Sequence, residues 1–171
     1  SEGIAYMAHQ FSWPYGFPSH SNPGAPGVIL EGGELGYSLS TAYGSVLDNP
    51  NLITVCMVGD GEAETGPLAT AWHLNKIVSP LNNGAVLPVL HLNGYKISGP
   101  TFMGRMSDSE LTKLFEGYGY EPHIVDAYTE ADVHERMRVV LDHAYEAIRF
   151  TQHCAREGTL HENPRFPMII L

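Results

Sequence analysis

The chain has 171 residues, of which 43% are hydrophobic and 16% are charged, a composition typical of a globular domain with a buried core. It carries nine Lys and Arg residues against nineteen Asp and Glu residues, and the net charge of −10 argues against nucleic acid as a partner, because phosphate backbones bind clustered cations. No apolar run reaches the ~18 residues of a membrane span and no signal peptide is recognisable, so we expect a cytoplasmic protein without a membrane partner.

The N-terminal part of the sequence predicts a shaped loop followed by a helix. Residues 19–27 contain too many prolines and glycines for a helix or a central strand. Residues 35–47 follow the Gly32-Gly33 turn with spaced apolar and small side chains. This pattern predicts a helix that ends at Asp48-Asn49-Pro50.

Strand and helix patterns alternate in the middle of the chain. The apolar run 52–58 predicts a strand, residues 68–78 a helix with a proline in its first turn, and residues 85–92 a second strand. Ser107 is followed by Glu110 at the spacing of a capping box, which predicts that another helix begins there.

The C-terminal part continues this alternation. Residues 122–125 predict a short strand, residues 131–157 have the clearest helical period, and residues 168–171 predict a buried strand. Together the patterns favour the α/β class, with a mostly parallel sheet covered by helices on both faces. Because the chain starts without methionine and stops inside a strand pattern, we expect residues 1–171 to form one partial domain, incomplete at both ends.

The two cysteines are expected to be buried free thiols in a reducing compartment rather than a disulfide. Cys56 lies in the apolar strand pattern and Cys154 in the long helical pattern.

A carboxylate stands inside a glycine turn directly after the strand at 52–58. A strand, a glycine turn and a helix start usually bind phosphate through backbone N–H groups. Asp60 in Gly59-Asp60-Gly61 would repel a phosphate about 4 Å away by roughly 4 kcal/mol at an effective dielectric of 20, so a divalent cation between them is the simplest explanation. The sequence therefore suggests a metal-bridged diphosphate.

The second part of this site follows the strand at 85–92. If the two strands are parallel neighbours, Asp60 and Asn93 leave the sheet at the same carboxyl edge, where ligands of open α/β sheets bind. A carboxylate, an amide oxygen and a turn carbonyl such as that of Tyr95 are hard ligands that suit Mg²⁺, with Ca²⁺ as a substitute.

Three other interpretations of the Asp60 turn compete with a metal ligand. An acid in a tight glycine turn is equally often a helix N-cap. An EF-hand is excluded because its twelfth position would be Ala71, where a bidentate Glu is required. A dinucleotide-binding fingerprint is excluded because Glu64 stands where the third glycine belongs.

Gly-Asp-Gly followed by Asn about thirty residues later is the thiamine diphosphate fingerprint, and the sequence around it resembles the phosphoketolase family. The resemblance covers nearly the whole chain and is most specific at 59–69 and 91–97. Further matching blocks are 11–20, 31–37, 48–50, 72–76, 117–120 and 165–171. The resemblance implies a transketolase-like thiamine diphosphate-binding fold.

The resemblance also implies roles for particular residues. The expected cofactor contacts are Gly32, Gly33, Gly59, Asp60, Gly61, Glu62, Asn93, Tyr95 and Ile97. Among them Asp60, Asn93 and Tyr95 would ligate Mg²⁺. His20, in the matching Pro-Ser-His block, is the expected catalytic histidine. Leu30 stands where the family commonly has histidine, so this position cannot donate a proton or a hydrogen bond.

The other histidines are weaker candidates. His73 and His91 lie in matching blocks, but packing or strand-end hydrogen bonds would explain them as well. Four more are expected to be structural or surface groups: His134, His143 and His153 on the long helix and His161 in a polar loop.

The activity that the resemblance implies is cleavage of xylulose 5-phosphate or fructose 6-phosphate by inorganic phosphate, giving acetyl phosphate and an aldose phosphate. The acid that activates the aminopyrimidine ring would come from another domain, usually of a second subunit, so this chain alone should not catalyse the reaction. A transketolase-like transfer of the two-carbon unit, and a non-catalytic diphosphate-binding module, remain alternatives.

Overall fold

The computed structural model describes residues 2–129, 131–160 and 163–171, and it divides the chain into two compact units, 1–35 and 36–171. His161 lies outside the described residues. The expectation of one domain over 1–171 stays a prediction, because two compact units can also be parts of one domain. Among the described residues no helix is long and apolar enough to cross a membrane.

The first unit contains the helix α1 (Glu2–Gln10) and a long loop. The sequence did not predict α1, whose residues form no buried face. Phe11 and Phe17 form an isolated backbone bridge, and Ser12 N donates to Phe17 O at 2.6 Å. The stretch 19–27 contains neither helix nor strand, as predicted.

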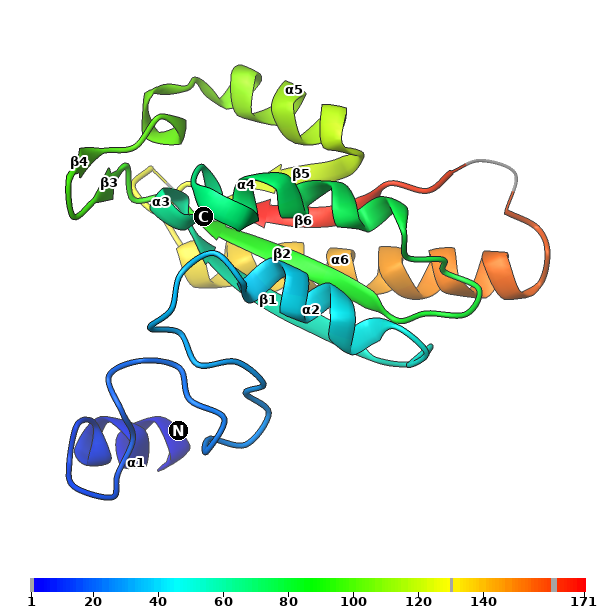
Figure 1. The fold of residues 1–171 in the computed structure, drawn as a ribbon. Helices are drawn as coiled ribbons and strands as arrows, with labels where there is room; N and C mark the ends of the chain where they lie inside the picture. The colour runs from blue at the N-terminus through cyan, green and yellow to red at the C-terminus, as the bar shows by residue number, and fades with distance from the viewer. Residues whose placement is uncertain (1, 130, 161–162) are drawn as a thin grey trace. The chain divides into compact units, whose positions relative to one another are not determined.

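The second unit is built on a four-stranded sheet in the order β1-β2-β6-β5, in which every neighbouring pair is parallel (Figure 1). Its strands are β1 (Ile53–Gly59), β2 (Ala85–His91), β5 (Tyr120–Ile124) and β6 (Phe166–Ile170). The mostly parallel α/β class predicted from the sequence is confirmed. The prediction at 122–125 missed the first two residues of β5.

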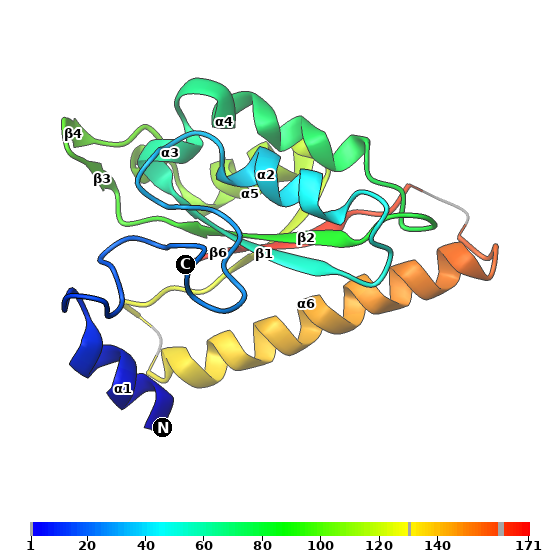
Figure 2. The same cartoon turned by 60° about the horizontal axis from the view of Figure 1, so that its bottom comes forward.

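Helices cover both faces of the sheet. One face carries α2 (Ser38–Val46), α4 (Gly66–Ala71), the 3₁₀ helix η1 (Trp72–Lys76) and α5 (Asp108–Tyr118). The long helix α6 (Val133–Arg156) lies on the opposite face, as the turned view in Figure 2 shows. Short elements join these layers: α3 (Asp60–Ala63), β3 (Tyr95–Lys96), β4 (Gly99–Pro100) and η2 (Met103–Arg105).

The core consists of two clusters, one on each face of the sheet. Strand β2 contributes to both by alternation: Val86 and Leu90 pack under α2, α4 and α5, whereas Leu87 and Val89 pack under α6. This explains why six successive residues of β2 are buried. Coverage of β1 is one-sided, because the side chains of its remaining face, such as Met57, are exposed.

Two helix predictions differ in outcome. The capping box before α5 is confirmed: Glu110 N donates to Ser107 Oγ at 3.4 Å, and Ser107 N donates to Glu110 Oε2 at 2.8 Å. The helix predicted at 68–78 is present as α4 and η1, although its second half is 3₁₀ and it ends at Lys76. There the Trp72 indole donates to Ala63 O at 3.2 Å and packs edge-on against Phe115 and Tyr120.

Both cysteines of the chain are free thiols. Cys56 is buried, as expected, and burial raises its pKa to about 12, so it is an inert core group. The expectation that Cys154 is buried is wrong, since it is only half-buried. It lies near the end of α6, many of whose other residues are exposed to solvent.

Gly84 provides a test of the packing before β2. A Cβ at Gly84 would lie 2.2 Å from Leu52 O and 2.6 Å from Asn49 O, backbone atoms that cannot rotate away. We expect Gly84→Ala to lower the free energy of unfolding by about 1–3 kcal/mol through overpacking. The measurement is denaturant or thermal unfolding of the full-length parent protein.

The matched control is Gly44→Ala, in the last turn of α2, where a Cβ would meet nothing within 4 Å. It should be neutral or stabilising by roughly 0.5–1 kcal/mol, because alanine is the better helix former. Equal destabilisation by both substitutions would contradict the packing described here.

Candidate metal and cofactor site

The register of β1 and β2 brings Asp60 and Asn93 to the same edge of the sheet. Gly59, the last residue of β1, pairs with His91, the last residue of β2. Asp60 follows directly at the start of α3, and Asn93 follows two residues after His91. The prediction that the two strands are parallel neighbours, with their carboxyl ends together, is therefore confirmed.

Asp60 is a buried carboxylate without a cationic partner. The residue is only 2% exposed. Its Oδ2 accepts hydrogen bonds from Gly94 N at 2.8 Å and from Thr101 Oγ1 at 2.7 Å. The second oxygen, Oδ1, accepts from Gly61 N at 3.0 Å and retains a lone pair. Within the part of the chain that the structure describes, no Lys, Arg or His forms an ion pair with it. Since a buried unpaired charge is costly, the environment suits a bound cation.

The N-cap reading of Asp60 does not fit this geometry. The residue before α3 is Gly59, and no side chain caps the helix. Two of the three donors to Asp60 come from the segment after β2, more than thirty residues away in the sequence. The carboxylate therefore joins the ends of two strands rather than closing its own helix.

Asn93 and Tyr95 form a tight turn beside this carboxylate. Asn93 Oδ1 accepts from Tyr95 N at 2.9 Å, and an amide oxygen with two lone pairs can accept a second contact. Both residues are exposed, as is Ile97, so all three can be reached by a ligand. The oxygen donors present fit the Mg²⁺ preference for carboxylate and carbonyl ligands.

The glycines of the turn differ in their surroundings. A Cβ at Gly61 would lie 2.8 Å from Lys96 Cβ, so this glycine permits the close approach of the segment after β2. A Cβ at Gly59 would meet nothing within 4 Å. Gly59 thus leaves backbone open beside Asp60, as a diphosphate cradle requires.

Two further carboxylates follow Asp60 and bind other segments. Glu62 Oε1 accepts from Gly36 N at 2.8 Å and from Ser38 Oγ at 2.9 Å, which fixes the start of α2. The cofactor contact expected of Glu62 stays a prediction, and the structure adds this structural role.

Glu64 binds the segment after β2 and was not predicted as a site residue. It accepts from Lys96 Nζ at 2.6 Å, from Phe102 N at 2.6 Å and from Met103 N at 3.1 Å. Burial would raise the pKa of Glu64, but the hydrogen bonds from Lys96 and the two backbone N–H groups outweigh it and lower the pKa below its usual range. The signal for this residue was its place in the same acidic block, four residues after Asp60.

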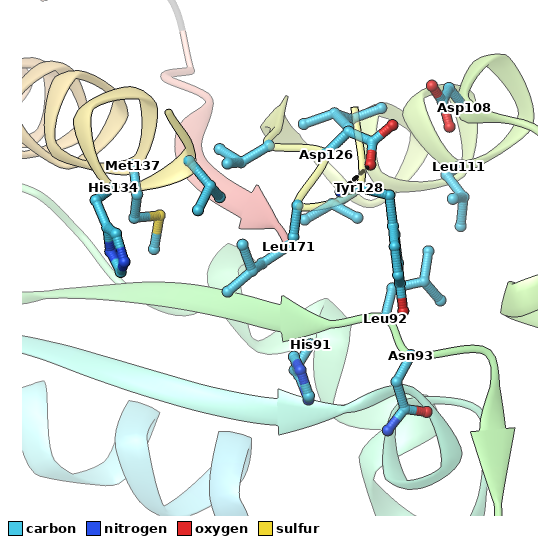
Figure 3. Close-up of a pocket in the computed structure, with 15 residues that line it drawn as sticks. His91, Leu92, Asn93, Asp108, Leu111, Asp126, Tyr128, His134, Met137 and Leu171 are labelled. Carbon is cyan, nitrogen blue, oxygen red and sulfur yellow. Dashed lines mark hydrogen bonds between the residues drawn. The ribbon is translucent and has the colours of Figure 1, made fainter. Parts of the chain in front are cut away.

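A pocket of about 500 Å³ opens at the carboxyl ends of β2, β6 and β5. Figure 3 shows three groups of side chains around it: His91 and Asn93 at and just after the end of β2, Asp126 and Tyr128 after β5, and His134 and Met137 at the start of α6. Asn93 connects the pocket to the Asp60 turn. The pocket therefore lies at the edge where ligands of parallel α/β sheets bind.

Asp126 and Tyr128 were missed because the sequence prediction stopped at the strand. Tyr128 N donates to Asp126 Oδ1 at 2.8 Å, and Thr129 Oγ1 donates to Oδ2 at 2.7 Å. The hydrogen bond from Thr129, and after it the bond from Tyr128 N, lower the pKa of Asp126 below its usual range. Their position in the sequence could have identified them, because polar residues follow β5 just as Asp60 and Asn93 follow β1 and β2.

The remaining predicted site residues belong to the first unit, 1–35. Gly32 N donates to Ser21 O at 2.9 Å, so the loop that carries His20 lies against the glycine turn. His20 is exposed, with Nδ1 3.3 Å from Ser19 Oγ. Gly33 N donates to Glu31 Oε1 at 2.8 Å. The structure thus joins the two predicted pieces of this unit, and their relation to Asp60 stays a prediction.

Comparisons with known proteins agree on one family. The family model described as "XFP N-terminal domain" matches residues 1–171. A "Probable phosphoketolase" of Gloeobacter violaceus is 56% identical over 171 residues, which are 100% of this chain and 22% of that protein. Another, of Mesorhizobium japonicum, is 55% identical over 172 residues, 99% of this chain and 21% of that protein.

A solved structure, transketolase from Leishmania mexicana, matches with a TM-score of 0.54 over 96% of this chain and 24% of that chain. At 17% identity this likeness concerns the fold alone. It agrees with the transketolase-like fold expected from the sequence.

Glu64 provides a test of the carboxylate contacts. In Glu64→Gln the ion pair with Lys96 is lost and the bonds to Phe102 N and Met103 N weaken. We expect hydrogen-exchange protection of these two amides to fall about tenfold in the full-length protein, because a hydrogen bond to a charged group contributes about 1.5 kcal/mol or more. Glu146→Gln, on the exposed side of α6, is the matched control and should leave both amides unchanged.

The same contacts imply a pH dependence. A carboxyl group whose pKa is lower in the folded state stabilises that state fully above its unfolded pKa, about 4.3 for glutamate. Protection of the Phe102 and Met103 amides should therefore be constant above that pH and fall as the pH drops through the lower folded value. Protection that is constant down to pH 2 would contradict this assignment.

Proposed function

The chain belongs to the XFP N-terminal domain family of phosphoketolases, and on this premise we propose that it holds the magnesium and diphosphate site of a thiamine diphosphate-dependent phosphoketolase. The observation that carries the proposal is the buried carboxylate of Asp60, which has no cationic partner among the described residues and lies beside open glycine backbone. A divalent cation held by Asp60 and a diphosphate would offset the repulsion between the two negative groups.

The proposed ligands of Mg²⁺ are Asp60, Asn93 and the carbonyl of Tyr95, with Ca²⁺ as a substitute. The proposed cofactor contacts also include Gly32, Gly33, Gly59, Gly61, Glu62 and Ile97. When bound, thiamine diphosphate supplies a thiazolium that stabilises a carbanion, while the protein supplies orientation and electrostatics. Gly94 and Thr101 keep the carboxylate of Asp60 in one orientation.

The proposed reaction is cleavage of xylulose 5-phosphate or fructose 6-phosphate with inorganic phosphate as acceptor, giving acetyl phosphate, an aldose phosphate and water. In it His20 takes up and returns protons at the substrate, a role that suits an imidazole because one ring nitrogen can accept a proton while the other donates one. His20 is exposed on a loop bonded to the glycine turn, so substrate can reach it.

The chain spans about a fifth of the length of the curated relatives it matches. Other domains of the same protein are therefore implied. We propose that they, together with a second subunit, complete the substrate pocket and supply the acid that activates the cofactor, so that the enzyme is a cytoplasmic dimeric lyase. Residues 1–171 would be one part of its diphosphate-binding domain.

Replacing Asp60 tests the metal site. In the full-length parent protein, Asp60→Ala should lower acetyl phosphate formation, measured as hydroxamate, at least about 100-fold, because a first ligand matters at least as much as the outer partners of a metal. Titration with thiamine diphosphate at several Mg²⁺ concentrations should show that the variant also loses affinity for the cofactor. Asp142→Ala, an exposed acid on α6 that pairs with Arg138, is the matched control and should keep full activity.

The outcomes of this experiment separate the alternatives. Exchange of two-carbon units between a ketose and an aldose, without acetyl phosphate, would mean a transketolase-like enzyme. Cofactor binding that depends on Asp60 without any turnover would mean a non-catalytic diphosphate-binding module. Unchanged activity in Asp60→Ala would overturn the metal site itself.

His20 provides an independent test of the catalytic assignment. We expect His20→Gln to lower kcat about 10²–10⁴-fold, the usual contribution of a general acid–base group, while the affinity for thiamine diphosphate stays the same. His9→Gln, an exposed histidine of α1, is the control from the same unit. A loss of cofactor affinity with unchanged kcat would instead make His20 a cofactor contact.

A further inference from the structure

A second cluster of ligand-type side chains lies between the edge strand β5 and the helix α6. Alternation along β5 directs Glu121 and His123 to the same side, and His143 approaches from α6. Their ligand atoms, one from each residue, all lie within 4.8 Å of one another. The two imidazole rings meet edge to face, with centroids 5.0 Å apart and planes at 76°.

One atom of this cluster is left without a hydrogen bond. His123 Nε2 is buried and has no partner. Its nearest carboxylate oxygen, Glu121 Oε1, lies 3.6 Å away, beyond the usual 2.7–3.2 Å of an N–H···O bond. A buried unsatisfied nitrogen is uncommon in folded proteins and calls for a partner such as water or an ion.

We propose that Glu121, His123 and His143 bind a divalent transition metal ion, best matched by Zn²⁺. Two imidazoles and a carboxylate are a common ligand set for zinc, with the fourth position open to water. Bonds of about 2.0–2.1 Å in a tetrahedron place ligand atoms roughly 3.4 Å apart. The separation of 3.6 Å between His123 Nε2 and Glu121 Oε1 is already close to that, and the exposed side chains of Glu121 and His143 can rotate inward.

The charges around the cluster are compatible with this ion. Arg136 on α6 contributes a positive charge near His123, which opposes a cation. The carboxylate of Glu121, whose Oε1 lies 3.6 Å from His123 Nε2, offsets that charge. A bound ion would satisfy His123 Nε2 and connect the edge strand β5 to the helix that covers it.

This cluster is separate from the proposed cofactor site. None of the three residues lines the pocket or bonds to Asp60. The ion would therefore act on stability rather than on the reaction. The proposal does not depend on the proposed function, and its test uses readouts other than turnover.

The test uses the full-length protein after its metal has been removed. Titration with Co²⁺ alone gives the visible spectrum of the site, and a separate titration with Zn²⁺ in competition with a chromophoric chelator gives the affinity for Zn²⁺. We expect the strong visible absorption of a four- or five-coordinate Co²⁺ site. In His143→Gln this absorption should disappear and the affinity for Zn²⁺ should fall at least about tenfold. Glu121→Gln should act in the same direction. Because both side chains are exposed, these variants should fold, which circular dichroism of the metal-free proteins checks.

Two controls make the result specific. His153→Gln, an exposed histidine near the end of the same helix, should leave the Co²⁺ spectrum and Zn²⁺ affinity unchanged. Asp60→Ala should also leave them unchanged, which separates this cluster from the magnesium site. Zn²⁺ should raise the thermal midpoint of the parent protein but not that of His143→Gln. Equal Co²⁺ spectra and Zn²⁺ affinities in the parent and His143→Gln would overturn the proposal and leave ordinary ring packing as the role of the two histidines.

Discussion

The carboxylates of one acidic block hold the site together. Asp60, Glu62 and Glu64 all lie within five residues, yet each binds a segment far away in the sequence. Glu62 binds the start of α2, while Asp60 and Glu64 bind the segment between β2 and α5. The loops of this edge therefore take their positions from side-chain oxygens on or next to a single short helix, α3.

This arrangement also explains the electrostatics of the site. Glu64 has a lysine partner, and Glu62 is bonded to a helix start, where negative charge is favourable. Asp60 has only neutral donors among the described residues, so it carries the charge that remains uncompensated. A cation from solution would therefore bind at Asp60, the carboxylate for which the described residues provide no counterion.

The sequence could predict those features that depend on local pattern. The capping box of Ser107 and Glu110 and the meeting of Asp60 with Asn93 follow from spacing and from the geometry of parallel strands. The partners of Glu64 could not be predicted, because hydrogen bonds between residues 38 or 39 positions apart leave no periodic trace. The 3₁₀ helix η1 begins at Trp72, whose side chain packs against Phe115 and Tyr120, and such distant contacts cannot be read from local pattern. Helix α1 was missed although Ile4, Met7 and Ala8 stand at helical spacing, and none of its residues is buried.

The order of strands has a consequence for folding. Strands β1 and β2 are neighbours in both sequence and space, but β5 has one partner strand in the described part of the chain, β6, which follows after the whole of α6. Until β6 is synthesised and inserted between β2 and β5, neither of these strands has its partner on that side. The sheet thus closes through contacts of large sequence separation, which slow folding, and a nascent chain would expose two open strand edges while α6 is still being made.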